Sequence, residues 1–308
     1  VPKSKAEIFD YMKETARVVD PVIIEYLERL RLEDGSLYEI VSHLPKLRTI
    51  GKRGRGRPKL RSTVGRLSYE AVSNDDWKLV VPILASTELI AMETYIIDDI
   101  LDNQSERDGD LATWNKYGLN AGIIAGFLQR DIGEEMLYRM NIEKGKLLRI
   151  LELSKDMHKT IYIGQHKNEE MSHETSLEDY IDRSYKIGGI FWDVIARMCA
   201  ITGNGTEEEI ETLGQCGKNY GIALQIRNDL TNLIPEEVLQ IDGRSQALAR
   251  TSYEDTKKGI WTYPNIHAIS IGDKNTDRII RSALGRRDIS DRELIELTST
   301  LLNSGSID

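Results

Sequence analysis

The chain has 308 residues, 40% of them hydrophobic, and a formal net charge of −9 at pH 7. This length supplies one large core in one or two domains, and the negative charge argues against a nucleic-acid-binding protein. Cys199 and Cys216 lack CxxC spacing, so no zinc or disulfide framework is expected. Because no apolar run reaches about 18 residues and no signal stretch leads the chain, we expect a soluble, cytoplasmic protein.

Apolar residues recur at helical spacing along most of the chain and predict an all-α fold. The first helix is expected over residues 5–32, with Pro21 marking a kink or a break into two helices. Ser73 and the acids after it predict the start of a long helix from about Asp75 to Asp102, irregular only at Pro82. Further helices are expected over residues 112–129, 143–170, 176–201, 206–237, 245–258, 262–271, 275–285 and 290–303.

Residues 51–61, Gly-Lys-Arg-Gly-Arg-Gly-Arg-Pro-Lys-Leu-Arg, are dense in cationic side chains and hold three glycines. Such a segment does not form a regular helix. It lacks the residue order of a P-loop. One interpretation is a loop that presents guanidinium and ammonium groups to phosphate oxygens, and the other is a solvated basic loop or a localisation tag.

A cluster of carboxylates lies at the C-terminal end of the long apolar helix. Asp98 and Asp102 are four residues apart, so both side chains leave the same helix face. Their mutual repulsion, the apolar surroundings and the helix dipole all disfavour two negative charges there, unless a cation lies between them. Mg2+, which takes one or two carboxylates together with water and phosphate oxygens, suits this arrangement. A helix end that runs into a solvated acidic loop is the alternative.

Cationic side chains and glycines follow one another in the predicted helix that a Ser176 capping box opens. Arg183 and Lys186 are three residues apart and are expected on one face. The pair Gly188 and Gly189 comes directly after them. It predicts a helix break or a close approach of the backbone to a ligand, and helix packing through small residues is the competing interpretation.

A second oxygen-rich cluster lies near the end of the helix predicted to begin at Thr206. Asn228, Asn232 and Glu236 fall four residues apart on one helical stripe, which predicts a site with three metal ligands. Pro235 weakens this prediction, because a proline disrupts the preceding helical turn and displaces Glu236 from the stripe. Two lysines further along the chain are expected to close the site: Lys257 and Lys258.

Taken in order, these motifs resemble the trans-isoprenyl diphosphate synthase and class I terpene synthase superfamily. The most specific element is a DDxxD of Asp98, Asp99 and Asp102, with Arg107 and Gly109 where elongating enzymes carry Arg-Arg-Gly. The resemblance implies one isoprenoid-synthase-like domain over residues 1–308, a helical bundle around a central cavity, and a homodimer. Supporting residues are Gly164 with Gln165, Tyr180 with Lys186 in the place of a Lys-Thr pair, and Gln225 before the second metal motif.

The sequence departs from the pattern of chain-elongating members where they hold isopentenyl diphosphate. The basic loop is expanded, so that Lys52 is out of register with Arg57 and Pro58. A histidine expected seven residues before the first aspartate is Ala91, and the second arginine of Arg-Arg-Gly is Asp108. The absence of this histidine and of this arginine, together with the negative charge of Asp108, predicts a poor binding site for a second diphosphate.

The second metal motif also departs from the elongating pattern. Those enzymes usually carry another DDxxD, whereas Asn228, Asn232 and Glu236 resemble the Asn/Asp, Ser/Thr, Glu triad of class I terpene synthases. Arg183 precedes Asn228 by 45 residues, close to where those enzymes place an arginine that contacts the diphosphate. Asn232 stands in the Ser/Thr position of that triad.

The resemblance therefore implies an Mg2+-dependent terpene synthase that ionises an allylic diphosphate of C10 to C20 size and quenches the cation without isopentenyl diphosphate. The expected catalytic residues are Asp98, Asp99, Asp102, Arg183 and Lys186. The expected metal ligands are Asp98, Asp102, Asn228, Asn232 and Glu236. The expected diphosphate-binding residues are Arg107, Arg183, Lys186, Gln225, Lys257 and Lys258. Aromatic candidates for stabilising the cation, or for packing alone, are Tyr95, Phe191, Trp192 and Tyr220.

Three alternatives remain. The first is an elongating prenyltransferase in which Arg55, Arg57 and Arg61 substitute for the missing groups. The second is a prenyltransferase that acts on a non-isoprenoid acceptor, which needs only the allylic half of the site. The third is a non-catalytic subunit of a prenyl diphosphate synthase, against which the intact DDxxD argues, because carboxylates clustered without a metal destabilise a fold.

Overall fold

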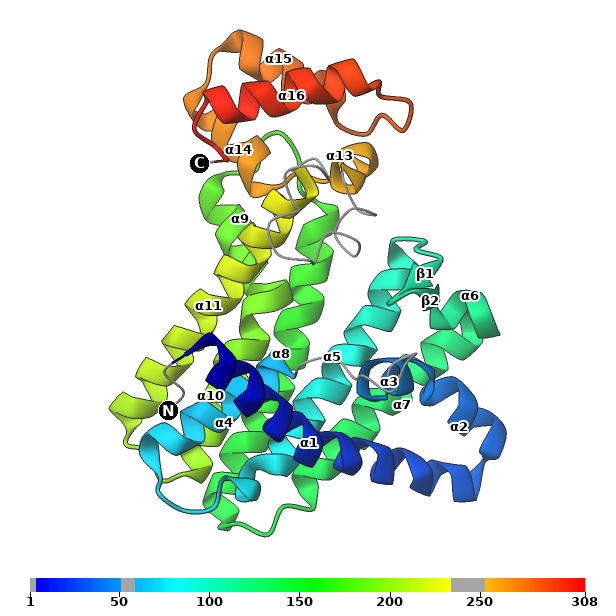
Figure 1. Ribbon diagram of the computed structural model, residues 1–308, viewed down its shortest axis with the longest axis vertical. Coiled ribbons are helices and arrows are strands. Elements are labelled where there is room, and N and C mark those ends of the chain that lie inside the picture. The colour runs from blue at the N-terminus through cyan, green and yellow to red at the C-terminus, as the bar shows by residue number, and fades with distance from the viewer. Residues whose placement is uncertain (1–3, 51–58, 234–252, 308) are drawn as a thin grey trace. The chain divides into compact units, whose positions relative to one another are not determined.

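The computed structural model describes residues 4–50, 59–233 and 253–307, and these residues confirm the all-α prediction. Contacts divide the chain into two compact units. The first is Val1–His158 with Phe191–Gly217, and the second is Lys159–Ile190 with Lys218–Asp308. Each unit is described by itself. The helices and strands are drawn in Figure 1.

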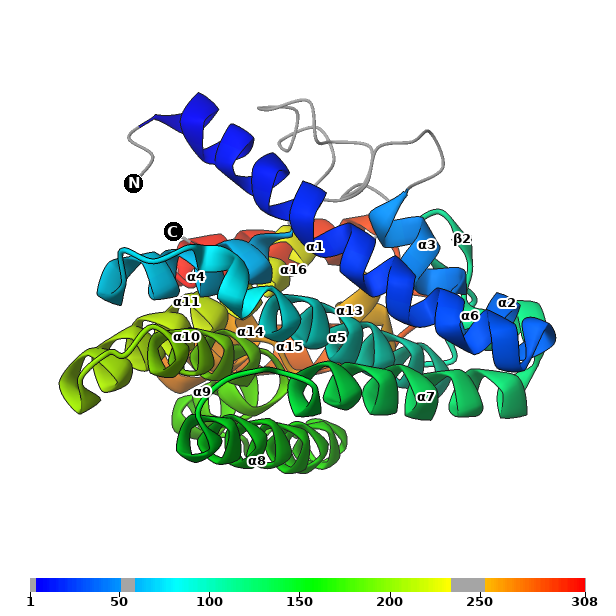
Figure 2. The same cartoon turned by 90° about the horizontal axis from the view of Figure 1, so that it is seen from below.

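The first unit is built around α5 (Val81–Leu101), which is apolar on nearly every side and is mostly buried. A helix of this kind must be covered all round. Helix α7 (Leu119–Tyr138) runs alongside it, and α1 (Lys5–Glu33) crosses it (Figures 1 and 2). The other helices of this unit are α2 (Gly35–Val41), α3 (His43–Thr49), α4 (Leu60–Val72), α6 (Thr113–Tyr117), most of α8 (Lys144–Glu169), most of α10 (Ile190–Thr202) and the start of α11 (Glu207–Leu233).

Pro21 and Pro82 were expected to interrupt two long helices of the first unit. Helix α1 continues through Pro21, so the predicted break into two helices is wrong. Pro82 stands in the first turn of α5, directly after a 3-10 turn over Trp77–Val80. A proline is favoured at that position, because its missing N–H has no helical partner there. The long helix thus begins at Val81 rather than near Asp75.

The chain between α5 and α7 is less regular than predicted. Gly118 has a φ of 96°, which ends α6 and separates it from α7, so the single helix expected over residues 112–129 is wrong. A short antiparallel hairpin precedes α6 and pairs β1 (Glu106–Arg107) with β2 (Asp110–Leu111). Asp108 and Gly109 form its two-residue turn, with φ values of 54° and 78°, as type I′ turns require.

The second unit has its own hydrophobic core, made by helices α14 (Tyr263–Ile271), α15 (Lys274–Ala283) and α16 (Asp291–Asn303) together with Leu233 at the end of α11. The three helices pack against one another in Figure 1. The unit also holds α9 (Leu177–Ser184) and α13 (Glu254–Lys258). The capping box predicted at Ser176 is confirmed, with Asp179 as its second member.

The glycine pair interrupts the helix that the capping box opens. A π-helical turn over Tyr185–Gly189 joins α9 to α10. A Cβ added to Gly189 would meet the Tyr185 ring at 3.1 Å and the carbonyl oxygen of Lys218 at 3.3 Å, so this glycine allows close packing on α11. Both predictions for the pair thus hold in part: the helix changes its winding, and a small residue is needed for packing.

Gly217 allows α11 to approach the backbone of α10 closely. A Cβ built there would overlap the carbonyl group of Trp192 and lie 3.0 Å from the backbone nitrogen of Asp193. We expect Gly217→Ala to lower the free energy of unfolding by about 2 to 3 kcal/mol in a urea titration, because the two helices must move apart. Gly35→Ala is the control, since nothing lies within 4 Å of the added Cβ. Equal stability of the two variants would contradict this packing.

Burial makes His158 sensitive to pH. Its side chain is buried, and burial together with Arg130 and Lys155 lowers its pKa from 6.5 to about 4, although the Glu134 carboxylate lies 3.3 Å from Nδ1 and opposes the shift. In the unfolded chain, the His158 imidazole binds a proton as the pH falls through about 6.5, whereas in the folded chain it stays neutral until the pH is near 4. We therefore expect His158 to account for about 2 kcal/mol of stability lost between pH 7.5 and pH 5.

Urea titrations at these two pH values measure the loss. His158→Asn should remove it, while the exposed His166 serves as the control through His166→Asn. An unchanged pH dependence in His158→Asn would contradict the buried neutral imidazole.

One helical stretch of the described residues, Trp77–Leu101, is long and apolar enough to cross a membrane. In the structure, 78% of its most apolar window is buried within the fold. Its apolar character is therefore explained by its place at the centre of the first unit.

Candidate active site

The last turn of α5 places the first two metal-ligand candidates one above the other. Asp98 lies within the helix, and Asp102 is its C-cap, whose backbone N–H donates to the Asp98 carbonyl at 2.8 Å. Asp102 is exposed, and Asp98 is partly buried. The helical spacing predicted for the two carboxylates is therefore confirmed.

Asp98 lies in surroundings that disfavour its charge. Burial, with further contributions from Asp102, Asp99 and Glu93, raises the pKa of Asp98 to about 7 in spite of the nearby Arg107. A divalent cation between Asp98 and Asp102 would relieve this cost, so the donor set fits Mg2+. Among the described residues no group of three His, Cys, Asp or Glu side chains could hold a metal alone. Water or phosphate oxygens would have to complete the coordination.

Asp99 has a different environment from its neighbours. It is buried, and both of its oxygens accept from Arg107 Nε, at 2.8 and 2.7 Å, while Nη2 lies 2.6 Å from Oδ1. Burial raises the pKa of Asp99, and the Arg107 guanidinium opposes that shift. Asp99 therefore fixes the hairpin arginine beside the two carboxylates instead of facing solvent with them.

Tyr95, one turn before Asp98, is surrounded by guanidinium groups. The carbon centres of Arg48, Arg107 and Arg61 lie 4.5, 5.0 and 5.7 Å from the centre of its ring. Burial alone would raise the pKa of Tyr95, but Arg61 and Arg48 hold it below its usual value. The sequence pointed to Tyr95 only as an aromatic residue for a carbocation, whereas the structure makes it the centre of a cationic cluster.

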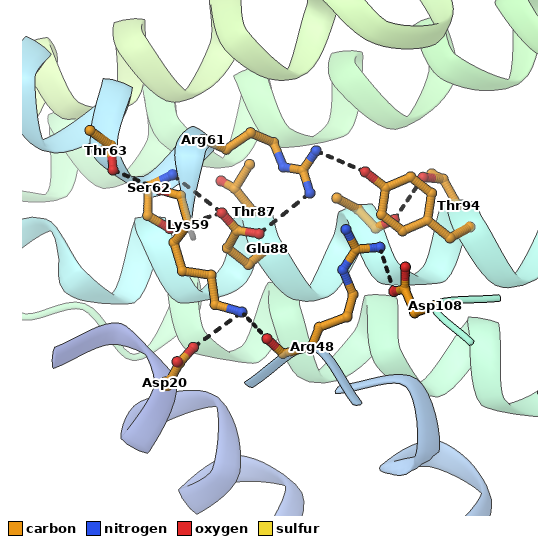
Figure 3. A network of polar contacts seen from close by, with 12 residues as sticks. Asp20, Arg48, Lys59, Arg61, Ser62, Thr63, Thr87, Glu88, Thr94 and Asp108 are labelled. Carbon is orange, nitrogen blue, oxygen red and sulfur yellow. Dashed lines mark hydrogen bonds and ion pairs between the residues drawn. The ribbon is translucent and has the colours of Figure 1, made fainter. Parts of the chain in front are cut away.

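The other two arginines, like Arg107, are paired with acids of the same unit (Figure 3). Arg61 donates to the Tyr95 hydroxyl at 3.0 Å and to Glu88 at 3.4 Å. Arg48 Nη1 lies 3.3 Å from the Asp108 carboxylate. Asp108 is thus not an isolated anion, and the objection raised by its charge is weakened.

The second unit holds the second oxygen-rich cluster, in which Asp229 is enclosed. It is buried and accepts from the Tyr180 hydroxyl at 2.5 Å, from Gln225 Nε2 at 3.0 Å and from the backbone nitrogen of Tyr263 at 3.1 Å. Burial raises its pKa, and these donors, with Arg183 nearby, oppose the shift. Asp229 therefore holds α11 to Tyr180 of α9 and to Tyr263 of α14. The predicted diphosphate contact of Gln225 stays a prediction.

The flanking asparagines keep oxygens that could bind a cation. Asn228 is exposed, as a ligand to a substrate-bound metal should be. Asn232 donates its amide to Asp255 at 2.6 Å, and its Oδ1 is buried without a hydrogen-bond partner among the described residues. An orphaned oxygen of this kind fits a metal ligand. Glu236, the third predicted ligand, lies outside the described residues, as does Pro235.

Arg183 and Lys186 do not share one face as predicted. Arg183 is buried, lies 4.9 Å from the centre of the Tyr180 ring, and donates to the Met171 sulfur at 2.9 Å. Lys186 belongs to the π-helical turn and pairs with Asp182. The change in winding after Ser184 explains why the three-residue spacing fails. Lys257 and Lys258 form the end of α13, with Lys258 exposed.

Most of the chain is similar in sequence to a known protein family. The sequence model of the polyprenyl synthetase family matches residues 46–301. The chain belongs to the polyprenyl synthetase family. It is therefore an enzyme of isoprenoid biosynthesis that acts on an allylic diphosphate, as the DDxxD motif indicated.

Relatives in this family match nearly the full chain. A short chain isoprenyl diphosphate synthase of Methanocaldococcus jannaschii is 28% identical over 295 residues, covering 96% of this chain and 83% of its own length. A geranylgeranyl diphosphate synthase of Methanosarcina mazei is 26% identical and covers 98% and 86%. The crystal structure of a geranylgeranyl pyrophosphate synthetase from Pyrococcus horikoshii matches with a TM-score of 0.86 and 26% identity, covering 99% and 88%.

The remaining aromatic candidates of the chain lie in different environments. Phe191 is buried beneath Arg61, whose carbon centre lies 5.7 Å from its ring, and Trp192 is buried in α10. Tyr220 is 39% exposed on α11. Packing explains the burial of Phe191 and Trp192. Of the four aromatic candidates, Tyr95 is the one that lies next to the DDxxD motif.

Proposed function

We propose that this protein is a trans-prenyl diphosphate synthase that joins an allylic diphosphate to isopentenyl diphosphate. The observation that carries the proposal is similarity along nearly the whole chain to proteins named as isoprenyl diphosphate synthases. This favours the elongating alternative over the terpene synthase that the sequence first suggested. The ion pair of Arg48 with Asp108 supports it, because it brings a guanidinium to a position where the sequence alone indicated only an anion.

In the proposed reaction, the C–O bond of geranyl, farnesyl or geranylgeranyl diphosphate breaks and pyrophosphate leaves. The alkene of isopentenyl diphosphate then attacks the allylic carbon, and a proton is lost from the adjacent carbon. Mg2+ held by Asp98 and Asp102 in the first unit would supply positive charge to the leaving group. Asn228 and Asn232 in the second unit are proposed as Mg2+ ligands of that unit. Arg107, fixed by Asp99, adds a cation beside Asp98 that needs no rearrangement as charge develops. We further propose a homodimer of the cytoplasm.

The apolar residues of α5 that precede the DDxxD motif are proposed to keep water away from the reaction. An allylic cation reacts with water unless its surroundings exclude it. The residues before the motif, from Ile83 to Ile96, are mostly buried and apolar. We expect these side chains to keep water away from the end of α5 that carries the two carboxylates.

The proposal is tested by mixing the enzyme and Mg2+ with each allylic diphosphate, alone and then with isopentenyl diphosphate, while pyrophosphate release is followed. We expect release that depends on isopentenyl diphosphate. Release of pyrophosphate from the allylic substrate alone would support a terpene synthase. Asn228 and Asn232 in the second metal motif are the residues that favour this alternative. Absence of release in every mixture would indicate another acceptor or a non-catalytic subunit.

A further inference from the structure

The three arginines around Tyr95 come from three different elements of the first unit. Arg48 comes from α3, Arg61 from α4 and Arg107 from β1. All three lie within 6 Å of one ring centre. A guanidinium held over an aromatic face is restrained in position but keeps the N–H groups at its edge for an anion. The cluster therefore has the form of a preorganised anion site.

The arginines differ in how firmly their acidic partners hold them. Arg107 makes contacts of 2.6 to 2.8 Å with Asp99. Arg61 is the innermost, bound to Glu88 and to Tyr95, and its Nε is buried without a hydrogen-bond partner among the described residues. Arg48 Nη1 lies 3.3 Å from Asp108 Oδ2, and the Asp108 side chain is 12% exposed, against 5% for Glu88 and 2% for Asp99. Because its acid is the most exposed of the three, the pair of Arg48 with Asp108 is the one that a ligand can reach most easily.

The carboxylate of Asp108 is placed by the turn that contains it. Asp108 and Gly109 both have positive φ in the two-residue turn of the β1–β2 hairpin. Aspartate and asparagine tolerate this conformation, whereas a long side chain is strained in it. The acid therefore suits the turn, and its position next to Arg48 is fixed by the hairpin backbone.

We propose that Arg48 binds the diphosphate of the non-allylic substrate and that Asp108 is an internal carboxylate which this diphosphate displaces. The inference rests on the proposed function, because it assigns the second diphosphate of that reaction. A diphosphate carries more negative charge than one carboxylate and offers paired oxygens to the guanidinium fork, so it competes successfully for Arg48. Tyr95 is a positioning residue, since its ring holds the plane of the guanidinium.

Two substitutions with opposite expected effects test this assignment. Arg48→Gln should weaken binding of isopentenyl diphosphate by about 10- to 100-fold, as expected for loss of a charged hydrogen-bonding partner. Asp108→Asn keeps a residue that tolerates the turn and removes the competing charge, so it should tighten binding by about 3- to 10-fold. Arg48→Lys keeps the charge without the fork and should fall between wild type and Arg48→Gln.

Calorimetric titration with isopentenyl diphosphate in the absence of Mg2+ measures these changes without turnover. Thermal melting of each variant checks that it folds. Arg29→Gln is the matched control, because Arg29 also lies over a tyrosine ring, 4.1 Å from the centre of Tyr26, but on the exposed surface of α1. It should bind as the wild type does.

The failures of the two proposals are distinguishable. If Arg48→Gln and Asp108→Asn bind isopentenyl diphosphate within about twofold of the wild type, the assignment is overturned, whether or not elongation occurs. If both variants shift binding as expected but no longer product ever forms, the binding assignment stands and the proposed reaction fails. A selective rise in KM for isopentenyl diphosphate in Arg48→Gln, with the allylic KM unchanged, would support both.

Discussion

Asp98→Asn is expected to lower kcat/KM by roughly 1000-fold, because it removes a negative charge that would hold Mg2+ on the leaving diphosphate while keeping the size of the side chain. Burial, with a smaller contribution from Asp102, raises the pKa of Asp98 to about 7, so a bound cation would favour the ionised form of this group. Steady-state kinetics with saturating Mg2+ measure the change.

Asp10→Asn, on the exposed face of α1, is the control for this substitution and should retain full activity. Removal of the metal by a chelator should abolish turnover of the wild type as well. If Asp98→Asn kept more than about a tenth of the wild-type rate, the carboxylate pair at the end of α5 could not be the main metal site.

The largest expected effect on stability comes from Asp229→Ala. Three donors lose their acceptor in this variant: the hydroxyl of Tyr180, the amide of Gln225 and the backbone nitrogen of Tyr263. Since buried donors without a partner are costly, we expect the free energy of unfolding to fall by about 3 to 5 kcal/mol. Urea unfolding followed by circular dichroism measures it.

Asn228, the residue before Asp229, is expected to matter for activity and not for stability. Asn228→Ala removes an exposed side chain and should change stability by no more than about 0.5 kcal/mol, yet it should impair Mg2+-dependent activity. The opposite pattern, a stable Asp229→Ala that is inactive and a normal Asn228→Ala, would make Asp229 the ligand and Asn228 dispensable.

Much of the fold could be predicted from the sequence because helical periodicity and caps are local signals. The Ser176 capping box and the helices near residues 262–271, 275–285 and 290–303 are present within a residue or two. The errors also have local causes. The positive φ of Gly118 divides a predicted helix, and Asp108 with Gly109 forms a type I′ hairpin turn that helical periodicity does not predict.

In the candidate site too, local features can be predicted from the sequence, whereas contacts between distant residues cannot. The spacing of Asp98 and Asp102 is visible in the sequence, and the structure places both on one helix end. The pairing of Arg48 with Asp108 joins residues 60 positions apart, and Arg61 reaches Tyr95 across 34. Helical periodicity does not predict contacts between residues so far apart in the chain. From the sequence alone, Asp108 is therefore an anion without a known partner, and Arg48 has no predicted role.

The most direct test of the central claim is the mass of the product formed from isotopically labelled isopentenyl diphosphate, an allylic diphosphate and Mg2+. The account predicts a labelled prenyl diphosphate longer than the allylic substrate by at least one isoprene unit, with its formation lost in Asp98→Asn. An unlabelled hydrocarbon or terpene alcohol as the sole product would contradict the account and would show that the cation is quenched without a second diphosphate.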